Sequence, residues 1–130
     1  METLFRAKIE NQDNIIQSKS IKKIGKFWYA FGNEITCHRG YYIKTSDAQE
    51  IECDYDTRAI WFSFMIDSIN NPIFASLDES GLGGDMIVYS EDMGGSKDDI
   101  ADVVIFDSNG GKMYYEQWDN YIVIDIKEDE

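Results

Sequence analysis

Acidic residues at alternate positions are the feature of this sequence with the clearest chemical potential. Residues 50–56 read EIECDYD, so Glu50, Glu52, Asp54 and Asp56 occupy every second position. Because successive side chains of a β-strand point to opposite faces, a strand here would carry four carboxylates along one face, about 6.6 Å apart. The row predicts a surface for positively charged groups; the alternative is a strand face kept charged for solubility and against edge-to-edge pairing.

A hairpin would place a second strand beside this row. A loop at residues 45–49 pairs Lys44 with Glu50 and Tyr42 with Glu52, and the same register continues to the end of the row. The apolar residues of both segments then share the opposite face. Tyr42 therefore joins the acids on the outer face, where a tyrosine can serve as a contact residue for a partner.

A second acidic region, residues 78–99, contains seven acids and five glycines. Calcium binds oxygen ligands from flexible loops, but an EF-hand loop needs acids or Asn at positions 1, 3 and 5, Gly at 6 and Glu at 12. The region lacks that spacing, which excludes an EF-hand and leaves open a calcium site built from two loops. It also lacks a complete GxGxxG or GxxxxGK[ST] motif, so no phosphate-binding loop is predicted.

Histidine and cysteine chemistry has few candidate residues in this sequence. His38 is the only histidine, and the adjacent Cys37 would point to the opposite face of a strand. Cys53 belongs to the apolar face of the hairpin, and both thiols are expected to be reduced core residues. The sequence predicts a protein without catalytic groups or cofactors. A hydrolase that uses two carboxylates stays open, since 25 acids offer many pairs.

Length and composition indicate a folded protein with a single domain, residues 1–130. The chain is 43% hydrophobic and contains 3 Trp, 8 Tyr and 7 Phe, which distinguishes it from a disordered acidic tail. Its longest apolar run, residues 59–66, is far shorter than the ~20 residues of a membrane helix. We therefore expect a cytoplasmic protein that does not bind a membrane.

Charge is distributed unevenly along the chain. Residues 1–44 contain eight Lys or Arg against four Asp or Glu, whereas residues 45–130 contain four against twenty-one; the two sums, +4 and −17, give the net charge of −13. An acidic surface repels nucleic acid and anionic membranes and favours basic proteins as partners. The lysines of residues 19–26 could also pair with the acidic face of a second copy, which would give a homodimer.

The secondary structure expected from the sequence pattern is mostly strand. Residues 4–10 alternate apolar and charged side chains, as in a half-buried strand. Asp13 can cap a short helix that continues to about Ile24. Gly32 and Asn33 lie between two segments rich in aromatic and β-branched residues, and they predict a two-residue hairpin turn.

Two later segments complete the fold prediction. Residues 59–69 are apolar enough for a strand or a short buried helix, and the turn signal NNP at 70–72 favours a strand. Residues 108–111 (SNGG) predict another hairpin turn. The expected fold class is β-dominated α+β, with antiparallel hairpin-rich sheets and one short N-terminal helix.

Together these patterns predict a non-enzymatic acidic inhibitor that occupies the basic cleft of a nuclease or another nucleic-acid-binding protein. The analogy, one of size and charge, is with small immunity proteins and with phage anti-defence proteins that mimic nucleic acid. The alternatives are a calcium-stabilised binding module, for example for carbohydrate, and a metal-dependent hydrolase. The predicted partner-binding residues are Glu50, Glu52, Asp54, Asp56, Tyr42, Asp78, Glu79, Asp85, Glu91, Asp92, Asp98, Asp99 and Tyr115.

Overall fold

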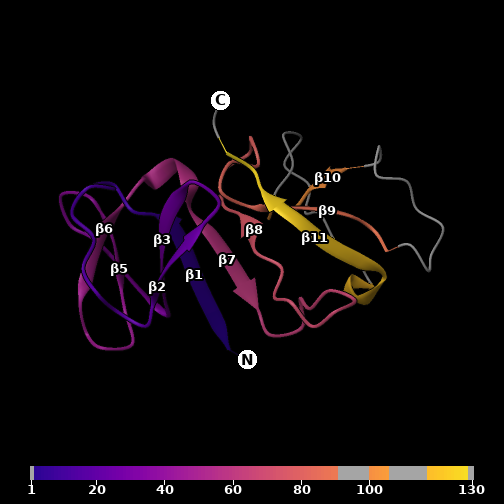
Figure 1. The fold of residues 1–130 in the computed structure, drawn as a ribbon, viewed down its shortest axis with the longest axis horizontal. Coiled ribbons are helices and arrows are strands. Elements are labelled where there is room, and N and C mark those ends of the chain that lie inside the picture. The colour runs from indigo at the N-terminus through magenta and orange to yellow at the C-terminus, as the bar shows by residue number, and fades with distance from the viewer. Residues whose placement is uncertain (1, 91–99, 106–116, 129–130) are drawn as a thin grey trace.

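Short β-strands joined by turns dominate the described part of the chain (Figure 1). The computed structural model describes residues 2–90, 100–105 and 117–128. Two elements, η1 (Tyr55–Thr57) and η3 (Trp118–Asn120), are 3-10 helices of three residues each. The strands are β1 (Thr3–Lys8), β2 (Ile21–Ile24), β3 (Phe27–Gly32), β4 (Glu34–Cys37), β5 (Tyr41–Lys44), β6 (Glu50–Cys53), β7 (Ala59–Phe62), β8 (Ala75–Ser76), β9 (Asp85–Tyr89), β10 (Ala101–Asp102) and β11 (Tyr121–Ile126).

Within the described residues these strands form three sheets. One has five strands in the order β2-β3-β1-β7-β8, and the others are β4-β5-β6 and β10-β9-β11. Neighbouring strands run antiparallel in each sheet, so the predicted β-dominated antiparallel class is confirmed. Figure 1 shows β5 and β6 at one end of the molecule and β9, β10 and β11 at the other.

The first core lies between the five-stranded sheet and the β4–β5–β6 sheet. The alternation predicted for residues 4–10 produces this packing, because Phe5, Ala7 and Ile9 all contact the core. The core supports the outer sheet, whose far face carries the site described below. Its buried residues are Ala7, Ile9, Ile21, Ala30, Tyr41, Ile43, Ile51 and Cys53.

The predicted hairpin of β5 and β6 is confirmed. Lys44 pairs with Glu50, and Tyr42 pairs with Glu52. The loop at 45–49 is closed by a backbone hydrogen bond from the Thr45 N–H to the Gln49 carbonyl oxygen, at 2.8 Å.

The carboxylate row ends earlier than the sequence predicts, so the predicted register is wrong beyond Cys53. At that residue β6 stops, and Asp54 caps η1 by accepting a hydrogen bond from the backbone N–H of Asp56 at 3.1 Å. Aspartate side chains favour such local turns over continued strands, because the carboxylate bonds the backbone two residues further on.

The predicted N-terminal helix is wrong. Residues 13–20 are irregular, Ile21–Ile24 form β2, and the described part of the chain contains no helix of seven or more residues. The Oγ of Ser18 accepts a hydrogen bond from the Ser20 N–H at 3.1 Å, and the Oγ of Ser20 lies 2.9 Å from that of Ser46. Such side-chain bonds compete with helical hydrogen bonds, and pairing with β3 favours the strand. None of the described helices is long and apolar enough to cross a membrane.

Gly32 and Asn33 do not form the predicted hairpin turn. The strands on either side, β3 and β4, belong to different sheets, so the chain passes from one sheet to the next at this point. A Cβ on Gly32 would lie 2.0 Å from the carbonyl oxygen of Lys44, so the glycine permits a close crossing. The hairpin turn lies instead between β4 and β5, where Arg39 has a φ of 65° and Gly40 a φ of 155°.

The second core lies between β7–β8 and the β10–β9–β11 sheet. The apolar run at 59–69 forms a strand only at 59–62, after which the chain leaves the sheet and contributes Met65 to this core. The strand interpretation is thus confirmed for β7, while the turn predicted at 108–111 lies outside the described residues. The buried residues of this core are Met65, Ile73, Ala75, Ile87 and Val103.

A buried ion pair joins β1, which contributes Ala7 to the first core, to β9, which contributes Ile87 to the second core. The Nη2 of Arg6 lies 2.9 Å from the Oδ1 of Asp85 and donates to the Gly83 carbonyl oxygen at 2.8 Å. The other oxygen of Asp85 accepts a hydrogen bond from the Phe74 N–H at 2.8 Å. Asp85, one of the predicted partner-binding residues, is only 2% exposed, and Arg6 inside the molecule already matches its charge.

Candidate functional site

The outer face of the β4–β5–β6 sheet carries the acids at the start of the predicted row. Tyr42 and Lys44 of β5, and Glu50 and Glu52 opposite them, point away from the first core. Glu34 of β4 lies opposite Lys44, and the two charged groups are 3.7 Å apart. We call this surface the acidic face, and its residues are Glu10, Glu34, Tyr42, Lys44, Glu50 and Glu52.

Two neighbours orient Glu52. The Tyr42 hydroxyl donates a hydrogen bond to its carboxylate, and this bond, with the charges of Glu52 and Glu50, raises the pKa of Tyr42. Gly40 leaves the carboxylate room, since a Cβ there would lie 2.8 Å from the Oε2 of Glu52. At neutral pH the phenol therefore stays protonated and keeps donating to the acid.

Glu10 reaches the acidic face from the end of β1. Ile9 forms an isolated antiparallel bridge with Cys53, and the Glu10 N–H donates to the Glu52 carbonyl oxygen at 3.0 Å. In this register Glu10 lies opposite Glu52, and its side chain is exposed. Sequence reasoning missed Glu10, because a contact between strands so far apart in the chain leaves no local signal.

Burial and neighbouring acids change the pKa of the Cys53 thiol. Burial raises the pKa of that thiol to about 12, and Glu10, Asp54 and Glu52 add to the rise. The thiol is therefore protonated at neutral pH and a poor nucleophile. Cys37, in contrast, is exposed, so the prediction of two core thiols is right only for Cys53.

Acids outnumber bases on the acidic face by four to one. Lys44, its single base, is paired with Glu34 and lies opposite Glu50. The Lys44 and Glu34 side chains are 43% and 66% exposed, so water screens their attraction and the pair contributes little to stability. The acidic face keeps a net negative charge and attracts positively charged groups.

The positively charged side chain of Arg58 lies beyond the end of β6, close to two predicted site residues, Asp54 and Asp56. Asp54 is half-buried and Asp56 is exposed on η1. The Arg58 guanidinium lies 3.6 Å from the ring centroid of Tyr55, and its Nε donates to the Tyr55 carbonyl oxygen at 2.6 Å. Asp54 and Asp56 thus lie in a mixed-charge segment, not in the strand row predicted for them.

The first residues of the second acidic region lie in a turn after β8. The Ser80 N–H and hydroxyl both donate to the Asp78 carboxylate; these bonds lower the pKa of Asp78, and the charge of Arg58 adds a smaller effect. Glu79 is exposed in the same turn. Arg58 is thus close to both η1 and this turn, so its positive charge acts on both predicted acidic regions. The other predicted residues, Glu91, Asp92, Asp98, Asp99 and Tyr115, lie outside the described residues.

Residues 2–90, 100–105 and 117–128 contain no candidate set of metal ligands. No three His, Cys, Asp or Glu side chains there are grouped so that they could hold a metal ion. His38 is exposed in the turn between β4 and β5. No observation in this part of the chain favours the calcium-site and metal-hydrolase alternatives.

Comparisons with protein-family models, with curated proteins and with solved structures find no match for this chain.

Proposed function

We propose that the protein is a non-enzymatic inhibitor whose acidic face occupies the basic cleft of a nuclease or another nucleic-acid-binding protein. The proposal rests on one observation. Glu10, Glu50 and Glu52 come together on the outer side of a packed sheet, with few basic residues beside them. A cleft that binds phosphates presents Lys and Arg side chains, which form charge-assisted hydrogen bonds with carboxylates equally well.

The face is arranged for binding before a partner arrives. Glu50 and Glu52 are about 6.6 Å apart on one strand, and that strand is bonded to β5 on one side and to the end of β1 on the other. Tyr42 also orients Glu52. Groups held in this way lose little conformational entropy when they bind, so more of the attraction contributes to affinity. Tyr42, half-buried, supplies an aromatic contact at the centre of the face.

Charge reversal on the acidic face tests the proposal. One variant is Glu50→Lys with Glu52→Lys. The matched control is Asp119→Lys with Asp125→Lys, which changes the net charge equally at exposed residues of η3 and β11. The wild-type protein captures its partner from a lysate of the cells that encode it, and the purified partner is then used to measure association rates at low and high salt.

We expect the face variant to associate at least about tenfold more slowly at low salt and the control to stay within about twofold of wild type. High salt should reduce the difference, because it screens steering between exposed charges. Wild-type protein should also block nucleic-acid binding or cleavage by the partner. Equal losses in both variants would contradict the assignment of the site, and a partner without nucleic-acid-binding activity would contradict the function.

A further inference from the structure

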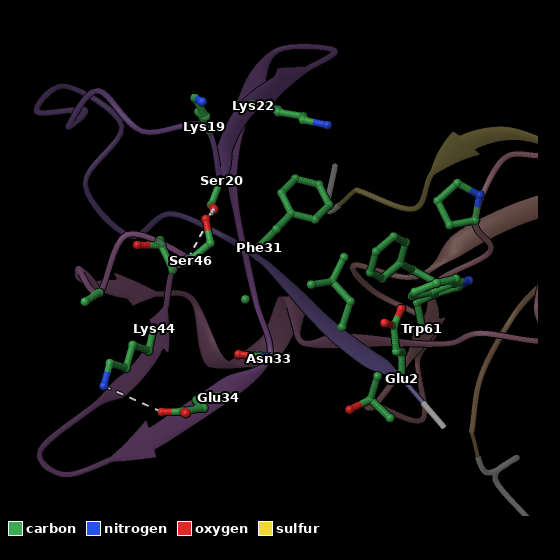
Figure 2. A pocket seen from close by; sticks show the side chains of 17 residues that line it. Glu2, Lys19, Ser20, Lys22, Phe31, Asn33, Glu34, Lys44, Ser46 and Trp61 are labelled. Carbon is green, nitrogen blue, oxygen red and sulfur yellow. Dashed lines mark hydrogen bonds and ion pairs between the residues drawn. The ribbon is translucent and has the colours of Figure 1, made fainter.

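A groove follows the face of the five-stranded sheet that points away from the first core (Figure 2). Its volume is about 1030 Å³. Leu4 and Phe31 line it, and they alternate along their strands with Phe5 and Ala30, which face the core. The lining crosses β2, β3, β1 and β7 in the order in which these strands pair. With strands about 4.8 Å apart, this crossing is about 14 Å long, the length of about four extended residues.

The β2 end of the groove is basic. Lys19 and Lys22 line it, and both are exposed. The Nζ of Lys22 lies 5.7 Å from the ring centroid of Phe31, so the lysine stem follows the groove floor. No ion pair involves either lysine within the described residues, although the protein has 25 acids and only 12 Lys or Arg.

The β7 end of the groove is aromatic and apolar. Trp61 and Phe74 line this end, and the Phe74 ring meets that of Phe31 edge to face at 5.7 Å. The indole N–H of Trp61 already donates to the Met65 carbonyl oxygen at 2.9 Å. The indole ring is thus oriented and its polar atom satisfied. Trp61 is partly buried against the second core, and the exposed part of its ring can make an apolar contact in the groove.

The rim of the groove is fixed by contacts between distant segments. The Oγ of Ser20 lies 2.9 Å from the Oγ of Ser46 and accepts a hydrogen bond from the Ser46 N–H at 3.3 Å, which ties the segment before β2 to the β5–β6 turn. Lys44, in the lining beside this turn, is paired with Glu34 (Figure 2). The unpaired positive charge therefore lies at the β2 end.

We propose that this groove binds an extended acidic segment of a partner protein, with carboxylates beside Lys19 and Lys22 and an apolar side chain over Trp61. The charge complementarity is directional, because the basic end of the groove lies at β2 and the apolar end at β7, three strands further across the same face of the sheet. Single-stranded nucleic acid fits less well. Its phosphates would run the full length of the groove, past the carboxylates of Glu2 and Glu34 in the lining. Glu34 and Lys44 border both the groove and the acidic face. The residues that test the two proposals differ, because Lys19 and Lys22 line the groove, whereas Glu50 and Glu52 do not.

Fluorescence polarisation with defined probes tests the groove. The first probe is a labelled peptide in which four glutamates precede a leucine and a phenylalanine, and the second has lysines in place of the glutamates. A labelled oligothymidylate is the third. The groove variant is Lys19→Glu with Lys22→Glu. The control, Lys23→Glu with Lys26→Glu, makes the same charge change at exposed lysines of the same segment that do not line the groove. Circular dichroism checks that both variants are folded.

The expected result is saturable binding of the acidic peptide only, at least about tenfold weaker in the groove variant and within about twofold of wild type in the control. No saturable binding of the acidic peptide up to about 1 mM overturns the proposal. Equal weakening in both variants also overturns it, because attraction would then be nonspecific. Tighter binding of the oligothymidylate than of the acidic peptide would assign the groove to nucleic acid instead.

Discussion

At the scale of single residues, two buried tyrosines differ in one hydrogen bond. Tyr29 and Tyr41 are 1% and 5% exposed. The Tyr29 hydroxyl donates to Glu128 at 3.3 Å, whereas the Tyr41 hydroxyl has no hydrogen-bond partner among the described residues. A buried polar group without a partner costs about 1–3 kcal/mol, so Tyr41 carries a hydroxyl that opposes folding.

Removing each hydroxyl should therefore have different effects. Tyr41→Phe is expected to leave the free energy of unfolding unchanged or to raise it by up to about 1 kcal/mol, whereas Tyr29→Phe should lower it by about 1 kcal/mol. Urea unfolding of the two variants beside wild type measures both values. A larger loss in Tyr41→Phe would mean that its hydroxyl makes a hydrogen bond in solution.

At the scale of elements, Gly32 decides how β3 is followed by β4. A side chain here would collide with backbone, because its Cβ would lie 2.0 Å from the Lys44 carbonyl oxygen. Gly25 differs, since its φ is 64° and its Cβ would meet only the end of the Glu128 side chain, at 3.5 Å. The first position is limited by space and the second by backbone conformation.

Alanine at these two positions distinguishes the two limits. Gly32→Ala should destabilise the protein by about 3 kcal/mol, because the sheets must move apart. Gly25→Ala should cost only about 1 kcal/mol, the cost of a left-handed conformation for an L-residue. Thermal unfolding of both variants provides the comparison, and a smaller loss for Gly32→Ala would contradict the close crossing of β3 and β5.

At the scale of the whole molecule, the pair of Arg6 and Asp85 couples β1, beside the first core, to β9, beside the second core. The Arg6 guanidinium also lies 4.3 Å from the ring centroid of Phe74 and 5.8 Å from that of Tyr29. Removal of one charged partner leaves the other charge buried and unmatched. The buried charge on β1 thus depends on its partner on β9, and the charge on β9 depends on its partner on β1.

A double-mutant cycle measures this coupling. Arg6→Met and Asp85→Leu should each cost about 3–5 kcal/mol, and the double variant should recover about 1–3 kcal/mol of the summed loss. Guanidinium unfolding gives the four free energies. Strict additivity would show that the two side chains act independently.

Alkaline pH should also destabilise the whole molecule. Burial raises the pKa of the Cys53 thiol to about 12 and raises the pKa values of Tyr29 and Tyr41 above the usual range of tyrosine. In the unfolded chain the thiol titrates near pH 8.5 and the tyrosines near pH 10. As the pH rises, the unfolded state therefore loses these protons first, and ionisation favours unfolding.

The free energy of unfolding should thus begin to fall above about pH 9, by about 1.4 kcal/mol per pH unit for each proton that only the folded state retains. Between about pH 10.5 and 12 all three groups contribute, and the slope approaches about 4 kcal/mol per pH unit. Urea midpoints measured from pH 7 to 11 follow the onset of this loss. Tyr41→Phe serves as the control, with a shallower slope, and a flat profile in wild type would contradict the burial of these groups.

Local alternation was enough to predict about half of the candidate site. It placed Glu50, Glu52 and Tyr42 together on one face, since the pairing of β5 with β6 depends on a short loop and a period of two. It extended the row too far, because a turn made by Asp54 competes with the strand. Glu10 could not be predicted, since its position depends on a bridge between β1 and β6.

The sequence by itself determined that this chain forms antiparallel strands with an outward-facing pair of glutamates, because side-chain alternation is a local property of the strand. Only the tertiary structure decided what surrounds them. It buried Asp85 against Arg6, and it used Gly32 for a crossing instead of a turn. It also formed β2 where residues 13–24 alone favour a helix. In each case the deciding contact joins segments far apart in the chain, and the free energy of that contact outweighs the local preference.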